Sequence, residues 1–190
     1  MFVVMDAKDE LNKTLSKFVK YVVTQSKSNL TRGDKNVKKK LYNSIKGDSF
    51  VGKNSIGIYF EMEEYGEFQD LGVKGKSSSA KAPNSPFRFG SGTGKKGGLT
   101  SGILEWVRAR RFQFKDRQTN RFMSYESTAY LITRSIYQKG IKPSRFFSKP
   151  FEVGFERLPD EVVESYGLDL EKLMKTSLKV WIYFAVEYHI

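Results

Sequence analysis

The sequence has no cysteine and a single histidine, His189, among its 190 residues. A chain without cysteine forms no disulfide, thiolate nucleophile, iron–sulfur cluster or cysteine-based zinc site. One histidine excludes a multi-histidine metal centre and leaves one residue for histidine-centred acid–base chemistry. These two absences exclude many classes of enzyme before any motif is considered.

Long hydrophobic runs are also missing. The longest apolar run covers residues 180–186, far short of the ~20 residues that a membrane-spanning helix needs. The apolar residues 1–5 are followed at once by Asp6, and no basic residue precedes them, which is unlike a secretory signal. The sequence therefore predicts a cytosolic or virion protein without a membrane partner.

The charge is plentiful and unevenly distributed. Lysine and arginine total 33 against 21 acidic residues, which gives a net charge of +12. Residues 1–47, 71–104 and 105–151 are net basic, whereas residues 48–70 and 152–190 are net acidic. This alternation suits head-to-tail contacts between copies, and it also suits a protein that binds a polyanion. Charge counts alone favour a third interpretation, a well-solvated surface.

Hydrophobic periodicity predicts an α+β fold, in which a small antiparallel sheet is flanked by helices. We expect helices over residues 6–26, 37–45, 99–112 and 124–139. Residues 55–62 alternate as a strand does, with Ile56, Ile58, Phe60 and Met62 on one face, and its hairpin partner begins near Phe50. Residues 63–72 read as a short helix or turn.

The second half of the chain carries clear boundary signals. Ser124 can cap a helix that ends at Gly140, where a left-handed residue is usual, and Pro143 prevents its continuation. Residues 113–121 resemble a polar loop or ribbon, and residues 146–155 are expected to be extended. Helices are predicted to start at residue 158 and again near residue 169.

Residues 72–102 differ in kind from the rest. They hold eight of the 16 glycines, six serines and no acidic residue, which predicts a long, flexible Gly/Ser/Lys-rich loop with a small aromatic anchor at residues 86–89. Its basic residues could follow a phosphate backbone, fold against an acidic neighbour on assembly, or be solvated. The candidate contact residues are Lys74, Lys76, Lys81, Arg88, Lys95 and Lys96.

Carboxylates are densest at residues 61–70, where two or three could support a metal-dependent nuclease if they converged in a cleft. No second acidic motif with ligand spacing accompanies them, so a solvated or interface surface is the favoured interpretation. Their members are Glu61, Glu63, Glu64, Glu67 and Asp70.

The C-terminal segment is apolar on every face, and such a segment must be buried in its own core or against a partner. We therefore expect a subunit interface here, in an extended segment that follows the main domain. The candidate interface residues are Trp181, Ile182, Tyr183, Phe184 and Val186.

Residues 129–147 read AYLITRSIYQKGIKPSRFF, a helix that ends in a Gly-Ile-x-Pro turn before an aromatic segment. This pattern resembles the tail-completion and head–tail connector (neck) proteins of tailed bacteriophages. Two further stretches are similar: residues 41–45 lead into a strand, and residues 65–73 precede a glycine-rich, basic insertion. The resemblance covers residues 10–155.

The resemblance implies a connector-like α+β domain over residues 1–155 with the loop 72–102, followed by a C-terminal helical and apolar extension over residues 156–190. It implies a non-enzymatic ring of six or twelve copies, without cofactor, that joins the portal or head to the tail within the virion. The loop would lie at the lumen or against an adjacent ring, with portal, connector or tail proteins as partners and non-specific contact with genomic DNA. The alternative function is a basic nucleic-acid-binding accessory protein, whose affinity would fall steeply with salt.

Overall fold

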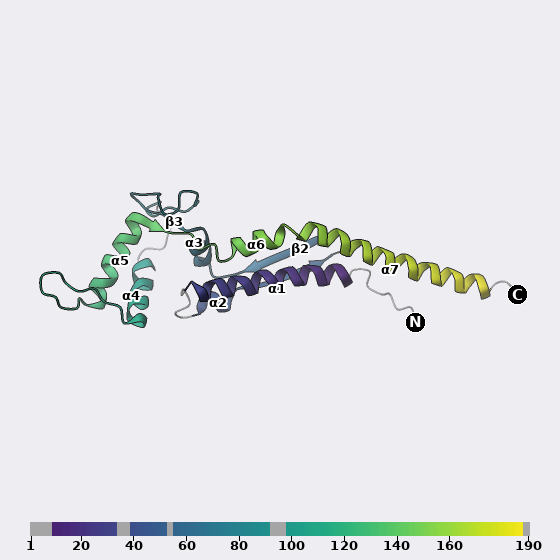
Figure 1. The fold of residues 1–190 in the computed structure, drawn as a ribbon, viewed down its shortest axis with the longest axis horizontal. Coiled ribbons are helices and arrows are strands. Elements are labelled where there is room, and N and C mark those ends of the chain that lie inside the picture. The colour runs from purple at the N-terminus through teal and green to yellow at the C-terminus, as the bar shows by residue number, and fades with distance from the viewer. Residues whose placement is uncertain (1–8, 34–38, 53–54, 92–97, 188–190) are drawn as a thin grey trace. The chain divides into compact units, whose positions relative to one another are not determined.

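The computed structural model describes residues 9–33, 39–52, 55–91 and 98–187, and the side chains of all of these except 173 and 176–187. Its fold is α+β, as the periodicity predicts. The helices are α1 (Asp9–Arg32), α2 (Lys40–Ser44), α3 (Tyr65–Leu71), α4 (Gly98–Arg110), α5 (Tyr125–Lys139), α6 (Ser148–Phe155) and α7 (Leu158–Glu187). The strands are β1 (Lys46–Val51), β2 (Ile56–Glu61), β3 (Val73–Lys74) and β4 (Gly140–Ile141) (Figure 1).

The chain divides into two compact units that alternate along the sequence. Unit 1 comprises the described parts of Met1–Ser28, Ile45–Glu61 and Lys149–Ile190. Unit 2 comprises the described parts of Asn29–Ser44 and Met62–Ser148. The expected boundary at residue 155 therefore falls inside unit 1, between α6 and the start of α7.

Unit 1 is built on an antiparallel β1–β2 hairpin with α1, α6 and α7 alongside it (Figure 1). Its aromatic centre is a triad of edge-to-face rings, in which Phe18 lies 6.3 Å from Phe60 and 5.7 Å from Phe151, centroid to centroid. Such pairs each contribute about 0.5–1.5 kcal/mol beyond their buried area. Gly154 permits the close approach of α6 to α1, because a Cβ there would lie 2.9 Å from the Phe18 ring.

A buried carboxylate fixes α7 against the start of α1. The backbone N–H groups of Glu10 and Leu11 donate to Asp169, at 3.2 and 3.1 Å. The first N–H groups of a helix have no partner within the helix, so Asp169 satisfies two donors that would otherwise be unpaired. One turn earlier on α7, the hydroxyls of Ser165 and Thr14 lie 2.6 Å apart.

Unit 2 packs α4 against α5 and joins the end of α5 to β3 through the two-residue β3–β4 pair. The boundary signals of α5 are confirmed, since Ser127 N–H donates to the Ser124 hydroxyl and Gly140 has φ +83°. After β4, the buried carboxylate of Asp70 accepts the backbone N–H groups of Phe147 and Ser148. Asp70 thus caps the N-terminus of α6.

That cap explains why the expectation of an extended segment at residues 146–155 is wrong. Residues 148–155 form α6 instead. Its start is stabilised by Asp70, which lies 78 residues away in sequence, and Pro150 falls in the first turn, where its missing N–H leaves no hydrogen bond unmade.

Three other boundaries also differ from the sequence prediction. Helix α1 continues to Arg32 rather than ending at 26, because Leu30 is fully buried and tertiary packing outweighs the local break signals. Helix α2 begins only at Lys40, and residues 37–38 lie outside the described residues. The two helices expected after residue 158 are the single helix α7.

Replacing Asp169 by alanine should destabilise the protein by about 1–3 kcal/mol, because two buried N–H groups lose their acceptor. Urea unfolding followed by circular dichroism measures the change. Glu171→Ala is the matched control on the same helix, since Glu171 pairs only with the exposed Lys175 one turn away. Equal effects of the two variants would contradict the role assigned to Asp169.

The ion pairs of Glu10 with Lys172 and Lys13 predict a specific acid dependence. Hydrogen bonds and charge attraction from the two lysines lower the pKa of Glu10 from 4.5 to about 2. Because the folded-state pKa is depressed, the pairs stabilise the folded chain above pH 4.5, and this contribution is lost as the pH falls through about 2.

Wild-type protein should therefore exceed Glu10→Gln in free energy of unfolding above pH 4.5, and the difference should disappear near pH 2. Because these groups are exposed, high salt should also reduce it. Urea titrations across this pH range test the prediction. A difference that did not vary with pH would exclude the ion pairs as its source.

Candidate interaction surfaces

The basic loop is more ordered than its composition predicts. At Lys74 the strand β3 forms a parallel bridge with Arg88. Lys74 N–H donates to Phe87 O at 2.8 Å, and Phe89 N–H donates to Lys74 O at 2.9 Å. Residues 75–91 consist mainly of turns and bends, as in a loop, but these bonds tie the loop to β3. The predicted end of the loop at residue 102 is wrong, because α4 begins at Gly98.

Buried side chains hold this loop in place. The hydroxyl of Ser85 donates to Gly72 O at 2.7 Å and accepts from Phe87 N–H at 3.1 Å. The predicted aromatic anchor contacts two helices of unit 2, since Phe87 lies edge-to-face on Phe68 of α3 at 4.6 Å and Phe89 lies 5.7 Å from Tyr137 of α5.

The structure describes four of the six candidate contact residues of this loop. Lys74 and Arg88 lie on adjacent bridged segments, Lys76 lies over the Tyr137 ring at 6.0 Å, and Lys81 is exposed in a turn. None of these four forms a salt bridge among the described residues. Lys95 and Lys96 lie outside the described residues. The loop thus presents cations on an ordered support, which suits an anionic partner.

The carboxylates of residues 61–70 do not converge. Asp70 belongs to α3, and its buried side chain caps the start of α6. Glu63 pairs with Lys40 at 3.0 Å. Glu61, Glu64 and Glu67 are exposed. Within the described ranges, no group of three His, Asp or Glu side chains is arranged to hold a metal ion. The described residues therefore hold no cluster of three such ligands for the nuclease alternative.

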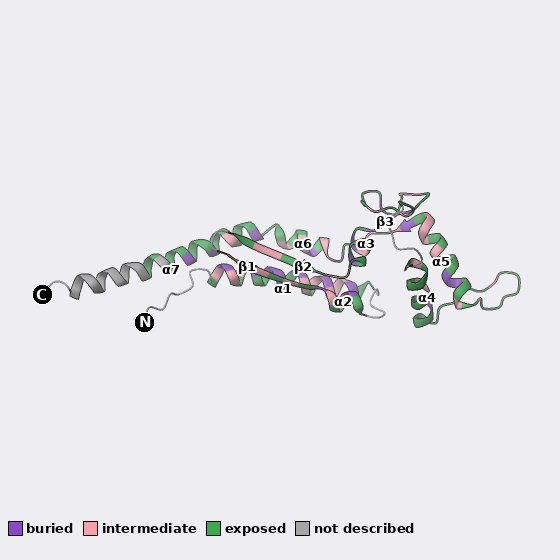
Figure 2. Cartoon of the chain, turned by 180° about the vertical axis from the view of Figure 1, so that it is seen from behind, coloured by how far each residue is buried: buried purple, intermediate pink, exposed green. Residues whose placement is uncertain are grey.

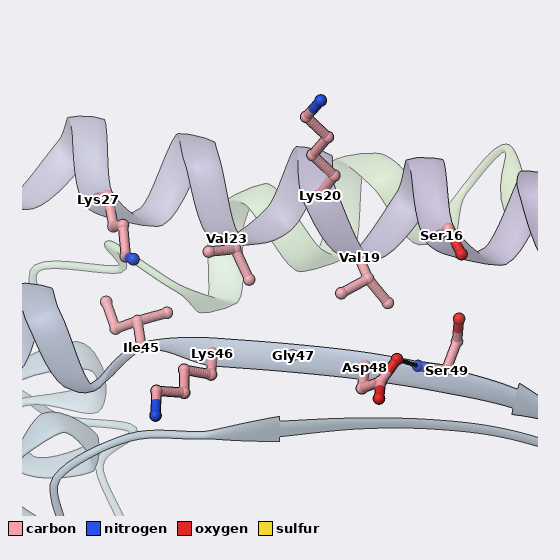
Figure 3. Close-up of a pocket in the computed structure, with 10 residues that line it drawn as sticks. All are labelled: Ser16, Val19, Lys20, Val23, Lys27, Ile45, Lys46, Gly47, Asp48 and Ser49. Atoms are coloured by element: carbon pink, nitrogen blue, oxygen red, sulfur yellow. Dashed lines mark hydrogen bonds between the residues drawn. The ribbon is translucent and has the colours of Figure 1, made fainter.

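Unit 1 contains a groove of about 480 Å³ between α1 and β1 (Figure 3). Val19, Val23 and Ile45 lie between the two elements, whereas Lys20 points away from them (Figure 3). Its one carboxylate, Asp48, accepts hydrogen bonds from Ser49 N–H and the Tyr59 hydroxyl, and the latter bond raises the pKa of Tyr59. This carboxylate already has its partners, so the groove is not organised for acid–base chemistry.

A second groove of unit 1, of about 380 Å³, is lined by apolar residues alone. It lies between α1, β2, α6 and the start of α7. Its lining residues are Leu15, Phe18, Ile56, Ile58, Phe60, Phe151, Phe155, Leu158, Pro159 and Val162.

Next to this groove, α7 exposes an apolar stripe that flanks its buried face. Val163, Tyr166, Leu170 and Met174 follow one another at helical spacing, and Val163 and Tyr166 are 72% and 62% exposed. Figure 2 shows α7 exposed over most of its described length, unlike α1 with its regular buried positions. We call these four residues the outer face of α7.

The predicted interface residues lie further along the same helix. The backbone of α7 continues to Glu187, but the side chains of Trp181, Ile182, Tyr183, Phe184 and Val186 lie outside the described residues. No helix in the described ranges has both the length and the apolar character needed to cross a bilayer.

Comparison of the chain with models of protein families, with curated proteins and with solved structures finds no match. The functional argument therefore depends on the surfaces of the chain itself.

Sequence reasoning missed the outer face of α7 because it divided this helix in two. The spacing of 163, 166, 170 and 174 was a readable signal, since three- and four-residue steps place side chains on one face of a continuous helix. It also gave no role to the exposed rings at the end of α4.

Replacing Ser85 by alanine should loosen the loop without unfolding the rest of unit 2, because its buried hydroxyl donates to Gly72 O across the base of the loop and accepts from Phe87 N–H within it. Amide hydrogen exchange should rise about tenfold over residues 73–89, as expected for the loss of about 1.4 kcal/mol of local stability. Ser101→Ala is the control, since that exposed hydroxyl bonds only within the first turn of α4. Unchanged exchange in Ser85→Ala would show that other contacts hold the loop.

Proposed function

We propose that the chain is a non-enzymatic structural protein of a tailed-phage virion, which forms a ring in the neck and joins the portal or head to the tail. The observation that carries the assembly part of this proposal is the outer face of α7. The resemblance of residues 129–147 to neck proteins supports the phage context, the virion location, and the count of six or twelve copies.

The outer face of α7 favours association because its apolar side chains are left in water in the single chain. Val163 and Tyr166 are mostly exposed although they neighbour residues that pack on α1. Burial of one such side chain contributes about 1.5–3 kcal/mol. The adjacent apolar groove enlarges the surface that a partner could cover.

A second copy of the chain is the partner that the charge favours. The outer face belongs to the acidic segment 152–190, which holds eight acidic and four basic residues, whereas residues 71–104 hold six basic and no acidic residues. An acidic segment of one copy can therefore meet a basic segment of the next. Contacts between two different surfaces are heterologous, and they close into a ring when the rotation allows it.

The mass of the purified chain in solution, without nucleic acid, tests this proposal. We expect a closed oligomer, or a monomer that converts to one as the concentration rises, and light scattering coupled to gel filtration distinguishes these. A monomer at every concentration, whose mass changes only when DNA is added, would contradict the proposal and favour the nucleic-acid-binding alternative.

Substitution of the outer face should separate assembly from folding. Tyr166→Gln should weaken association about tenfold or more, because an interface loses an apolar contact of at least ~1.4 kcal/mol, while the unfolding midpoint of the monomer stays unchanged. The matched control is Tyr130→Gln on α5, since Tyr130 is 59% exposed against 62% for Tyr166. Equal weakening by both variants would count against the outer face as the interface.

Truncation tests the rest of the helix. Deletion of residues 180–190 should lower assembly and change the solubility of the monomer, because it removes the apolar segment that we expect to be buried against a neighbour. If assembly and solubility both stayed as in the wild type, this segment would have no place in the interface.

A further inference from the structure

Helix α4 ends in a group of exposed aromatic and basic side chains that the proposed assembly does not use. The group continues into the ribbon that connects α4 to α5, which extends beyond the ends of both helices (Figure 1). We call it the arginine–aromatic surface. Its members are Trp106, Arg108, Arg110, Arg111, Phe112, Phe114, Lys115, Arg117, Arg121 and Phe122.

The end of α4 has a defined geometry. Arg111 N–H donates to Arg108 O at 3.1 Å, and Phe112 N–H donates to Val107 O at 2.9 Å. These are the two bonds of a Schellman C-terminus, and the ring of Phe112 lies 6.0 Å from Trp106. Arg111 occupies the left-handed position of this motif with φ +51°, where glycine is the usual residue.

The ribbon that follows is a short antiparallel hairpin rather than a loose loop. Lys115 pairs with Phe122, and Met123 N–H donates to Phe114 O at 2.8 Å. The carboxylate of Asp116 closes the turn by accepting N–H groups of Gln118 and Thr119 at 2.9 and 2.8 Å, and these bonds lower the pKa of Asp116. The ribbon is therefore held in shape before any ligand binds.

Positive charge dominates this surface. Residues 105–123 contain six basic and two acidic residues, and the carboxylate of one of the two, Asp116, is engaged in the turn. Arg108 pairs with Glu126. Among the described residues, no carboxylate forms a salt bridge with Arg111, Arg117 or Arg121, and all three are exposed.

Four aromatic rings are exposed beside these cations. Phe122 is 67% exposed, with the ammonium of Lys115 5.1 Å from its ring centroid. Trp106, Phe112 and Phe114 form a continuous row, since Phe112 lies 5.2 Å from Phe114 and 6.0 Å from Trp106. A solvated surface would gain nothing from rings in water, so this combination indicates a ligand with both anionic groups and flat rings.

We propose that the arginine–aromatic surface binds single-stranded nucleic acid without sequence preference. Arginine and lysine side chains contact the phosphates, and the exposed rings stack on unpaired bases. An acidic polypeptide would satisfy the cations but supply few rings for stacking, so the observations favour nucleic acid. This inference does not depend on the proposed ring assembly.

Binding of a fluorescent oligo(dT) of about 30 nucleotides to the full-length chain tests the proposal. Anisotropy should show binding at about 50 mM salt that weakens steeply by about 200 mM. Replacing both Arg117 and Arg121 by glutamine should weaken binding about tenfold or more, and should reduce the slope of log K against log salt by about 1.4, as expected for two lost phosphate contacts.

The matched control is Lys17→Gln with Lys20→Gln, which removes the same net charge from exposed positions of α1. It should leave the affinity within about twofold, whereas an equal loss in both double variants would show that only the net charge matters and would overturn the site. No binding of oligo(dT) at the lower salt would overturn the proposal outright.

Stacking of bases on the exposed rings can be measured separately, by tryptophan fluorescence. The chain contains two tryptophans, so Trp181→Phe leaves Trp106 as the single reporter. Bound oligo(dT) should quench its fluorescence, and a duplex of the same length should quench it less. Binding of duplex with equal affinity and equal quenching would overturn the preference for single strands. Polyglutamate that competed as well as oligo(dT) would overturn nucleic acid as the ligand.

Arg111→Gly separates binding from stability. Glycine adopts φ +51° without strain, so the free energy of unfolding should stay the same or rise. Affinity for oligo(dT) should nevertheless fall, because one phosphate contact is lost. Unchanged affinity in this variant would exclude Arg111 from the surface.

Discussion

The contact of Asp169 with the start of α1 is the constraint that decides which face of α7 unit 1 leaves exposed. Two backbone N–H groups of α1 point at one carboxylate on α7, and the Ser165–Thr14 contact lies one turn earlier. Together these contacts fix the rotation of α7 about its own axis. Once that rotation is fixed, Val163 and Tyr166 face outward, and the helix exposes these apolar side chains to solvent rather than burying them in its own core.

Much of the fold could be predicted from local pattern. The alternation at residues 55–62 identified β2, and Ser124 and Gly140 identified both ends of α5. Both signals come from residues that are close together in the sequence. Helix α6 could not be found in this way. Its N-terminus is capped by Asp70, and no local signal indicates an acceptor that arrives from another part of the chain. Leu30 shows the same limit, since its burial, rather than its propensity, continues α1 to Arg32.

The surfaces were predictable in composition but not in geometry. The count of glycines and lysines marked residues 72–102 as unusual, yet residues 73–91 are held by backbone hydrogen bonds at Lys74, by the buried hydroxyl of Ser85 and by two aromatic contacts. Likewise, the arginines near residue 110 were visible in the sequence as favourable charges at a helix end. Only the Schellman geometry and the hairpin show that they share a surface with Phe112 and Phe122.

The outer face of α7 and the arginine–aromatic surface differ in the physics of what they can bind, and this difference makes them separable. Apolar association gains its free energy from water released at Val163 and Tyr166, and salt does not screen it. Phosphate binding at Arg117 and Arg121 gains from counterion release and weakens with every increase in salt. A chain that carried one function on both surfaces would show a single salt dependence for assembly and nucleic acid binding. Two different chemistries instead imply that rising salt would release the nucleic acid while the apolar contact still holds the copies together, although salt also screens the attraction between acidic and basic segments.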